Sequence, residues 1–71
     1  MAVAEPLIVN ARGMKCPWPA LRAARAMRDA PAIVIEADDP IAPGELAALA
    51  QAQGWTFRAL GDHRFSLSIA P

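Results

Sequence analysis

The sequence predicts an α/β fold of the α+β two-layer sandwich type, with the order β-α-β-α-β-β, a mixed four-stranded sheet and two helices on one face. Three observations predict it. Apolar runs rich in β-branched residues alternate with stretches of helical periodicity, and the last part of the chain changes to apolar–polar alternation. The 71 residues carry no internal repeat and no linker, which indicates a single domain, residues 1–71.

The first two elements are a strand and an amphipathic helix. Residues 7–9 form a short apolar run that ends at Asn10 and Gly13, which indicates a buried strand followed by a turn. Helical periodicity then extends from Pro17 to about Arg28. Its apolar face is predicted to comprise Pro17, Ala20, Leu21, Ala24 and Met27, and its polar face Arg22, Arg25 and Asp29.

The next two elements repeat this order. Residues 32–37 form a second apolar run bounded by prolines, which indicates another buried strand. A helix is expected over residues 43–53, with a proline in its first turn, Glu45 near its positive end and Gly54 as its terminator. Its packing face is predicted to comprise Leu46, Leu49, Ala50 and Gln53.

The last third of the chain predicts a hairpin with one buried face. Residues 55–59 and 64–69 alternate apolar and polar around a turn at residues 61–63. The inward side chains are predicted to be Trp55, Phe57, Ala59, Phe65, Leu67 and Ile69. A right-handed crossover sets the first two strands parallel with the helix on one face, and the polar side of the hairpin leaves the other face open to water.

Composition excludes several classes of function. Seven basic and seven acidic residues cancel, so nucleic acid is not expected as a direct partner. A single cysteine in so small a domain indicates a reducing, cytoplasmic environment. The start of the chain has no basic residue ahead of its apolar stretch, and Glu5-Pro6 interrupts it, so neither a signal peptide nor a membrane span is expected. We expect a cytoplasmic monomer without a membrane partner.

The only cysteine, Cys16, lies at the predicted start of the first helix, between a glycine turn and two prolines. If Cys16 is the N-cap, Pro17 is N1 and Pro19 is N3, where a missing N–H group costs nothing. The N–H groups of Cys16 and Trp18 then stay free beside the sulfur. Because helix N-termini carry partial positive charge, they lower the pKa of a thiol.

Basic residues precede and follow Cys16 in the sequence. Arg12 and Lys15 precede it, and Arg22 lies one to two turns beyond it, whereas the immediate sequence holds no carboxylate. We therefore predict that Cys16 is substantially thiolate at neutral pH. The alternative is that Cys16 is a small buried hydrophobe, which is the commoner position of a free cysteine.

The residues around the thiol limit the reactions that it can perform. Pro19 takes the place of the second cysteine of a C-x-x-C motif, so Cys16 has no resolving partner. Acyl transfer by cysteine requires a histidine base, but the only histidine, His63, lies in the predicted hairpin turn, where we expect a solvated residue. One Cys and one His do not form a zinc set, and we expect neither metal nor cofactor. These exclusions leave a thiolate that takes a group from one protein and gives it to another.

Two blocks of sequence carry a family resemblance. Residues 12–25, R-G-M-K-C-P-W-P-A-L-R-A-A-R, and residues 36–40, E-A-D-D-P, resemble the TusA/SirA-like family of small sulfur-carrier proteins. The family motif C-P-x-P falls on residues 16–19, and A-D-D-P follows at the family's spacing. The resemblance covers residues 7–69.

The resemblance implies a sulfurtransferase-type persulfide carrier with Cys16 as the catalytic, persulfide-forming thiol. Cys16 would accept sulfane sulfur from a donor such as a cysteine desulfurase or a rhodanese-like protein and yield it to an acceptor protein. The implied pathways include tRNA thiolation, sulfur oxidation and cofactor sulfuration. The supporting residues predicted around Cys16 are Arg12, Gly13, Lys15, Pro17, Trp18, Pro19 and Asp39.

The chain departs from the family pattern where positive charge is common. Gly44-Glu45 replaces a frequent Arg-Asp pair, and Ser68 and Ala70 replace basic residues at the end of the last strand. These differences remove positive charge from one end of the molecule, and so alter the surface that would meet the docking partners known for the tRNA-thiolation members.

Two features near the thiol have two interpretations each. Asp39 or its neighbour Asp38 satisfies backbone donors near the second helix while Pro40 fixes the turn, or the carboxylates position a basic surface of the donor. Trp18 folds back over the strand end, or it is an exposed anchor for a partner.

Two further functions compete with the sulfur carrier. One is a regulatory or interaction domain on the same fold, with Cys16 as a redox-sensitive thiol. The other, a nucleic-acid-binding module, is disfavoured by the zero net charge and by the lack of interleaved basic and aromatic residues on a strand.

Overall fold

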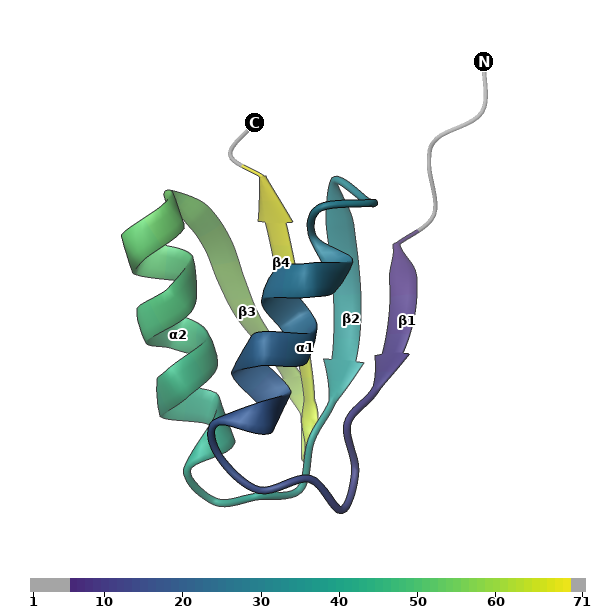
Figure 1. Ribbon diagram of the computed structural model, residues 1–71, viewed down its shortest axis with the longest axis vertical. Helices are drawn as coiled ribbons and strands as arrows, with labels where there is room; N and C mark the ends of the chain where they lie inside the picture. Colours follow the sequence, from purple (N-terminus) through teal and green to yellow (C-terminus); the bar gives the residue numbers. More distant parts are fainter. Residues whose placement is uncertain (1–5, 70–71) are drawn as a thin grey trace.

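The computed structural model describes residues 6–69, and its elements follow the predicted order β-α-β-α-β-β (Figure 1). The elements are β1 (Leu7–Asn10), α1 (Trp18–Ala26), β2 (Ala32–Glu36), α2 (Ala42–Gln53), β3 (Trp55–Gly61) and β4 (Arg64–Ile69). The strand order is β1-β2-β4-β3, with β1 parallel to β2 and β4 antiparallel to both of its neighbours. Both helices cover the same face of the sheet (Figure 1), so the predicted two-layer sandwich is confirmed.

The core lies between the helices and the two central strands. Ile33 and Ile35 of β2 are fully buried, because alternate residues of a strand point to the same face. Leu67 of β4 and Leu46 of α2 are buried with them. Phe65 stacks on Phe57 with ring centroids 5.8 Å apart, a geometry that adds to area burial. Within residues 6–69, neither helix is long and apolar enough to cross a membrane.

The predicted core face of α1 was wrong, because the helix is rotated about its axis relative to the prediction. The helix begins at Trp18, one residue later than expected, and its buried residues are Pro19 and Ala23, followed by Met27 at the C-cap. These residues are four apart and therefore lie along one stripe. Leu21, which was assigned to the core, is 52% exposed. Alanines occur on every side of this helix, so the apolar pattern had too little contrast to fix the face.

Strand β1 is an edge strand and not the buried strand that its composition predicted. It pairs with β2 on one side only, and of its residues only Val9 is buried, whereas Leu7 and Ile8 are exposed. Three other predicted core positions are also exposed. Gln53 and Ile69 are the last residues of α2 and β4, and Ala59 lies in the edge strand β3 next to an irregularity in its pairing with β4.

Two loops meet at one edge of the sheet. Because β1 and β2 are parallel, residues 11–17 and residues 37–41 both leave the carboxyl ends of their strands on the same side (Figure 1). The N–H of Ala11 donates to the carbonyl of Glu36 over 2.8 Å, which extends the parallel pairing into the loops. The first loop carries Cys16 and the second carries Asp39, so the fold brings the two sequence blocks together.

Candidate functional site

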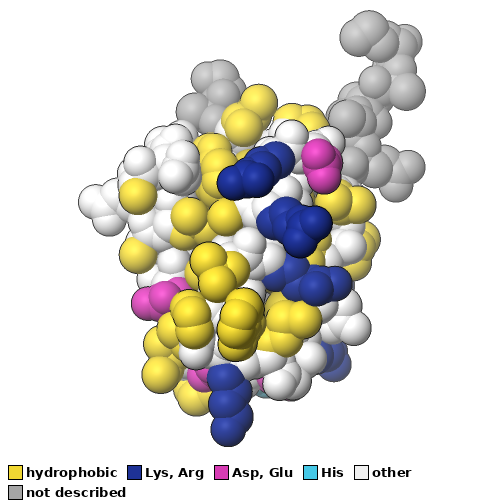
Figure 2. Space-filling view, viewed as in Figure 1, with side chains coloured by type: hydrophobic (Ala, Val, Ile, Leu, Met, Phe, Trp, Pro, Cys, Tyr) yellow, Lys and Arg dark blue, Asp and Glu magenta, His cyan; other side chains and the backbone are white. Residues whose placement is uncertain are grey.

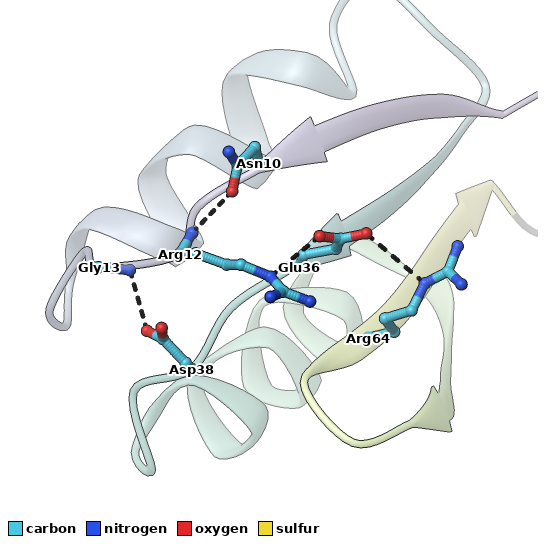
Figure 3. Close-up of polar contacts among 6 residues, drawn as sticks. All are labelled: Asn10, Arg12, Gly13, Glu36, Asp38 and Arg64. Carbon is cyan, nitrogen blue, oxygen red and sulfur yellow. Dashed lines mark hydrogen bonds and ion pairs between the residues drawn. The ribbon is translucent and has the colours of Figure 1, made fainter.

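The loop before α1 turns at Gly13. Its φ of +80° lies in the left-handed region, which favours glycine. The N–H of Met14 donates to the carbonyl of Ala11 over 3.2 Å and closes the turn. The N–H of Gly13 donates to a carboxylate oxygen of Asp38 over 3.0 Å, as Figure 3 shows. Asp38 thus fixes the turn that leads to Cys16.

Asp39 ties the cysteine loop to the start of α2. One carboxylate oxygen accepts the N–H of Cys16 over 2.6 Å, and the other accepts the N–H of Ile41 over 3.0 Å. The backbone carbonyl of Asp39 also accepts the N–H of Ala42 over 3.0 Å. The hydrogen bonds from Ile41 and Cys16, with a smaller contribution from Lys15, hold the pKa of Asp39 below its usual range. The interpretation of Asp39 as a residue that satisfies backbone donors is confirmed.

Arg12 is directed toward the sheet and not toward the sulfur. Its Nε lies 3.0 Å from the carboxylate of Glu36, which Arg64 also approaches at 3.8 Å (Figure 3). The N–H of Arg12 donates to Oδ1 of Asn10 over 3.1 Å. The carboxylate of Glu36 therefore compensates a charge that was expected to act on the thiol.

Cys16 precedes α1 without capping it. Pro17 is the N-cap, after a cis Cys16-Pro17 peptide bond, and Pro19 is the second helical residue. The two N–H groups expected to be free beside the sulfur both have acceptors. That of Cys16 donates to Asp39, and that of Trp18 donates to the carbonyl of Lys15 over 2.9 Å. The predicted anion site made of these two free donors is therefore wrong.

The pKa of the Cys16 thiol is raised, which contradicts the prediction of a thiolate in the resting protein. Partial burial is the first cause, followed by a hydrogen bond with the side chain of Glu45 and by the negative charges of Glu45 and Asp39. The sequence around Cys16 is basic, but the fold places carboxylates from a separate segment beside the sulfur. Their negative charge adds to the effect of burial on this pKa.

Glu45 is the site residue that the sequence analysis missed. It was assigned only to the positive end of the second helix. The signal that identifies it is topological, because parallel strands deliver their following loops and helix starts to one edge of the sheet. The first turn of α2 thereby comes to lie beside the start of α1.

Cys16 opens into a shallow hollow of about 500 Å³. Both loops line it, through Gly13, Met14, Lys15, Cys16, Asp38, Asp39, Pro40 and Ile41. The cysteine is half-buried, so it is not the fully buried hydrophobe of the alternative interpretation. An open hollow with a partly accessible thiol admits a group presented by another protein.

The remaining predicted site residues lie around this hollow. Trp18 is 61% exposed and lines a neighbouring hollow on α1 together with Arg22. Of the two interpretations of Trp18, the structure thus favours the exposed one. His63 is an exposed turn residue whose carbonyl accepts the N–H of Ala37 over 3.0 Å. Within residues 6–69, no three His, Cys, Asp or Glu side chains gather in a group that could hold a metal ion.

The structure describes two of the three positions at which this chain lacks the positive charge that is common in the family. Gly44 lies in the first turn of α2 and Ser68 in β4, whereas Ala70 lies outside the described residues.

Comparison with known proteins agrees with the fold and the motifs. Residues 7–70 match the family described as sulfurtransferase TusA. The crystal structure of a SirA-like protein from Desulfitobacterium hafniense superimposes with a TM-score of 0.76 at 18% identity, over 92% of this chain and 99% of that chain. At that identity the likeness concerns the fold alone. No curated protein matches the sequence at a significant level. Because the family match spans nearly all of the sequence, the chain belongs to the sulfurtransferase TusA family.

Proposed function

We propose that this protein accepts sulfane sulfur on Cys16 as a persulfide and passes it to an acceptor protein. Proteins of its family act generally as sulfur carriers between donor and acceptor proteins. The observation that carries the proposal for this chain is the position of its only cysteine. Cys16 is half-buried in an open hollow, and a carboxylate fixes its backbone from the opposite loop. Enclosed apolar pockets are typical of small-molecule sites, so an open hollow favours a macromolecular partner.

The two transfer steps balance without an external oxidant. The Cys16 thiolate attacks the outer sulfur of the donor's persulfide, R–S–SH. A sulfur–sulfur bond forms at Cys16, the donor's sulfur–sulfur bond breaks, and the donor thiolate leaves. In the second step, a thiolate of the acceptor attacks the outer sulfur of the Cys16 persulfide, and the Cys16 thiolate leaves.

The first step requires the resting thiol to lose its proton. Glu45 raises the pKa of the thiol from the first turn of α2, and we propose its carboxylate as the general base. Asp39 and Gly13 hold the loop in place, and Pro17 and Pro19 restrict the backbone on the helix side of the sulfur. These residues position the thiol, and the partner proteins supply and remove the sulfur.

The donor class that fits this chemistry is a protein that itself forms a cysteine persulfide. A cysteine desulfurase and a rhodanese-like protein both meet this requirement. The protein then acts as a sulfurtransferase only together with its partners, because its one cysteine has no resolving thiol.

Mass spectrometry of the intact protein tests the proposal. After incubation with inorganic polysulfide and removal of the excess, we expect a mass gain of one sulfur atom on Cys16 that a reducing agent reverses. The Cys16→Ser protein, which keeps the size and the hydrogen-bonding capacity of the side chain, is expected to gain nothing. Delivery is measured by transferring labelled sulfur from the loaded protein to an acceptor thiol. Uptake without delivery would instead favour a regulatory, redox-sensitive thiol.

A further inference from the structure

We propose that the exposed face at the start of α1 is the docking surface of the sulfur-donor protein, and that the donor meets it with an apolar side chain flanked by carboxylates. We call this surface the α1 docking face. Its residues are Met14, Trp18, Leu21, Arg22 and Arg25, which together line one hollow of about 360 Å³. The inference rests on the proposed sulfur-carrier function and adds the chemistry of the partner.

The apolar part of this face is large and is not needed for the core. Trp18 is 61% exposed and Leu21 is 52% exposed, whereas the buried stripe of α1 faces the sheet. Figure 2 shows hydrophobic side chains gathered over the N-terminal end of the helix. Exposed tryptophan is typical of the central anchors of protein interfaces, and a contiguous apolar patch around it marks an interaction site.

The basic part of the face determines the charge of the partner. Arg22 and Arg25 are exposed and line the apolar hollow on one side. The ion pairs found among residues 6–69 are those of Glu36 with Arg12 and Arg64, so the two α1 arginines are outside them. Figure 2 shows basic side chains in a row along the helix, beside the hydrophobic group. Complementary carboxylates on the donor would pair with this row and accelerate association.

A second hollow limits the extent of the basic face. Arg22 and Arg25 also border a groove against β1 that contains one acidic residue, Asp29. Asp29 follows the end of α1, away from the thiol. The basic side chains thus extend from the apolar hollow toward the end of α1, where Asp29 offsets part of their charge.

The α1 docking face is continuous with the thiol hollow. Met14 lines both hollows, and Trp18 follows Cys16 by two residues at the start of the helix. A donor that covers the face therefore brings its reactive sulfur to the mouth of the adjacent hollow. The docking face is therefore adjacent to the sulfur atom that takes part in the transfer step.

The test compares two sources of sulfur. Inorganic polysulfide loads Cys16 without an interface, whereas a cysteine desulfurase with its cysteine substrate, or a rhodanese-like protein with thiosulfate, must dock. For each variant, the loading rate from the protein donor is divided by the loading rate from polysulfide. Dividing the two rates cancels any effect that a substitution has on the reactivity of the Cys16 thiol itself. Circular dichroism and thermal melting confirm that each variant is folded.

We expect the ratio to fall about tenfold or more for Trp18→Ala and for the double variant Arg22→Glu/Arg25→Glu. We also expect salt to slow loading of the wild-type protein but to accelerate loading of the charge-reversed protein, because salt then screens a repulsion. The matched controls are Leu60→Ala, which removes an exposed leucine of β3, and Arg58→Glu, which reverses an exposed charge of the same strand. Both controls are expected to leave the ratio unchanged.

Three outcomes decide between the proposals. Equal ratios in the docking-face variants and in the two controls would overturn the docking face. Loading of the wild-type protein from polysulfide but from neither protein donor would also overturn it, while the proposed role of Cys16 would remain. Failure of Cys16 to gain sulfur from any of the three sources would overturn the proposed function itself.

Discussion

The pKa of the Cys16 thiol is raised first by partial burial and then by residues that are distant in the sequence. Glu45 and Asp39 raise this pKa through their negative charge. Because the thiolate and not the thiol is the nucleophile, a raised pKa lowers the reactivity of Cys16 toward small oxidants. Under the proposed function, sulfur loading requires removal of the thiol proton when the donor persulfide is in place.

Replacing Glu45 by Gln is expected to lower the pKa of Cys16. Glutamine keeps the size of the side chain but removes the negative charge that raises this pKa. The rate of Cys16 alkylation by iodoacetamide, followed as a function of pH, should therefore reach its half-maximal value at a lower pH. Asp29→Asn, which removes a charge after the end of α1, is the control. An unchanged or higher midpoint in Glu45→Gln would contradict the assignment of Glu45.

Replacing Asp39 by Asn is expected to destabilise the protein at neutral pH. The pKa of Asp39 is lowered in the folded state, so its carboxylate contributes stability above its unfolded pKa and loses that contribution as the pH falls through the folded value. The urea midpoint of the variant should thus lie below that of the wild type at pH 7, and the difference should shrink below about pH 4. A difference that is constant over this range would show that charge plays no part.

At the scale of single residues, the sequence predicted which residues form the site better than it predicted the charges around them. Cys16, Gly13 and Asp39 were recognised, and the structure places all three in one hollow. The charge around the sulfur was not predicted, because it depends on Glu45 and Arg12, whose partners are determined by the tertiary fold. Sequence neighbours alone gave the wrong sign for the pKa shift.

At the scale of elements, periodicity predicted every helix and strand but not every orientation. Strong contrast between apolar and polar residues identified the buried residues Phe65 and Leu67 of β4 correctly. The alanine-rich α1 lacks that contrast, and its face was misassigned. The exposure of β1 followed from its place at the sheet edge, which composition does not encode.

The corrected face of α1 is testable by adding volume. Ala23 is fully buried, so Ala23→Leu must displace neighbouring atoms and is expected to cost about 1–3 kcal/mol of unfolding free energy. Ala48→Leu adds the same atoms at an exposed position of α2 and should change stability by about 0.5 kcal/mol or less. Urea unfolding measures both. Equal effects of the two substitutions would show that Ala23 does not face the core.

At the scale of the whole molecule, one small core holds the site together. The two loops around Cys16 are positioned by the carboxyl ends of β1 and β2, and by the first turn of α2. A single cysteine allows no internal disulfide to reinforce them. The geometry of the thiol hollow therefore depends on packing between the helices and the sheet.

Leu46→Ala is expected to disrupt the fold and the site together. Leu46 is fully buried and follows Glu45 in the first turns of α2. Removing its side chain costs about 2–5 kcal/mol, whereas a domain of this length is stable by roughly 4–11 kcal/mol. A large part of the stability is thus lost, and Cys16 should be alkylated faster in moderate urea as the unfolded population rises. Leu60→Ala, at an exposed position, makes the same change in composition and should leave both the urea midpoint and the alkylation rate close to those of the wild type. If the two variants unfolded at the same urea concentration, the site would not depend on the packing of α2 against the sheet.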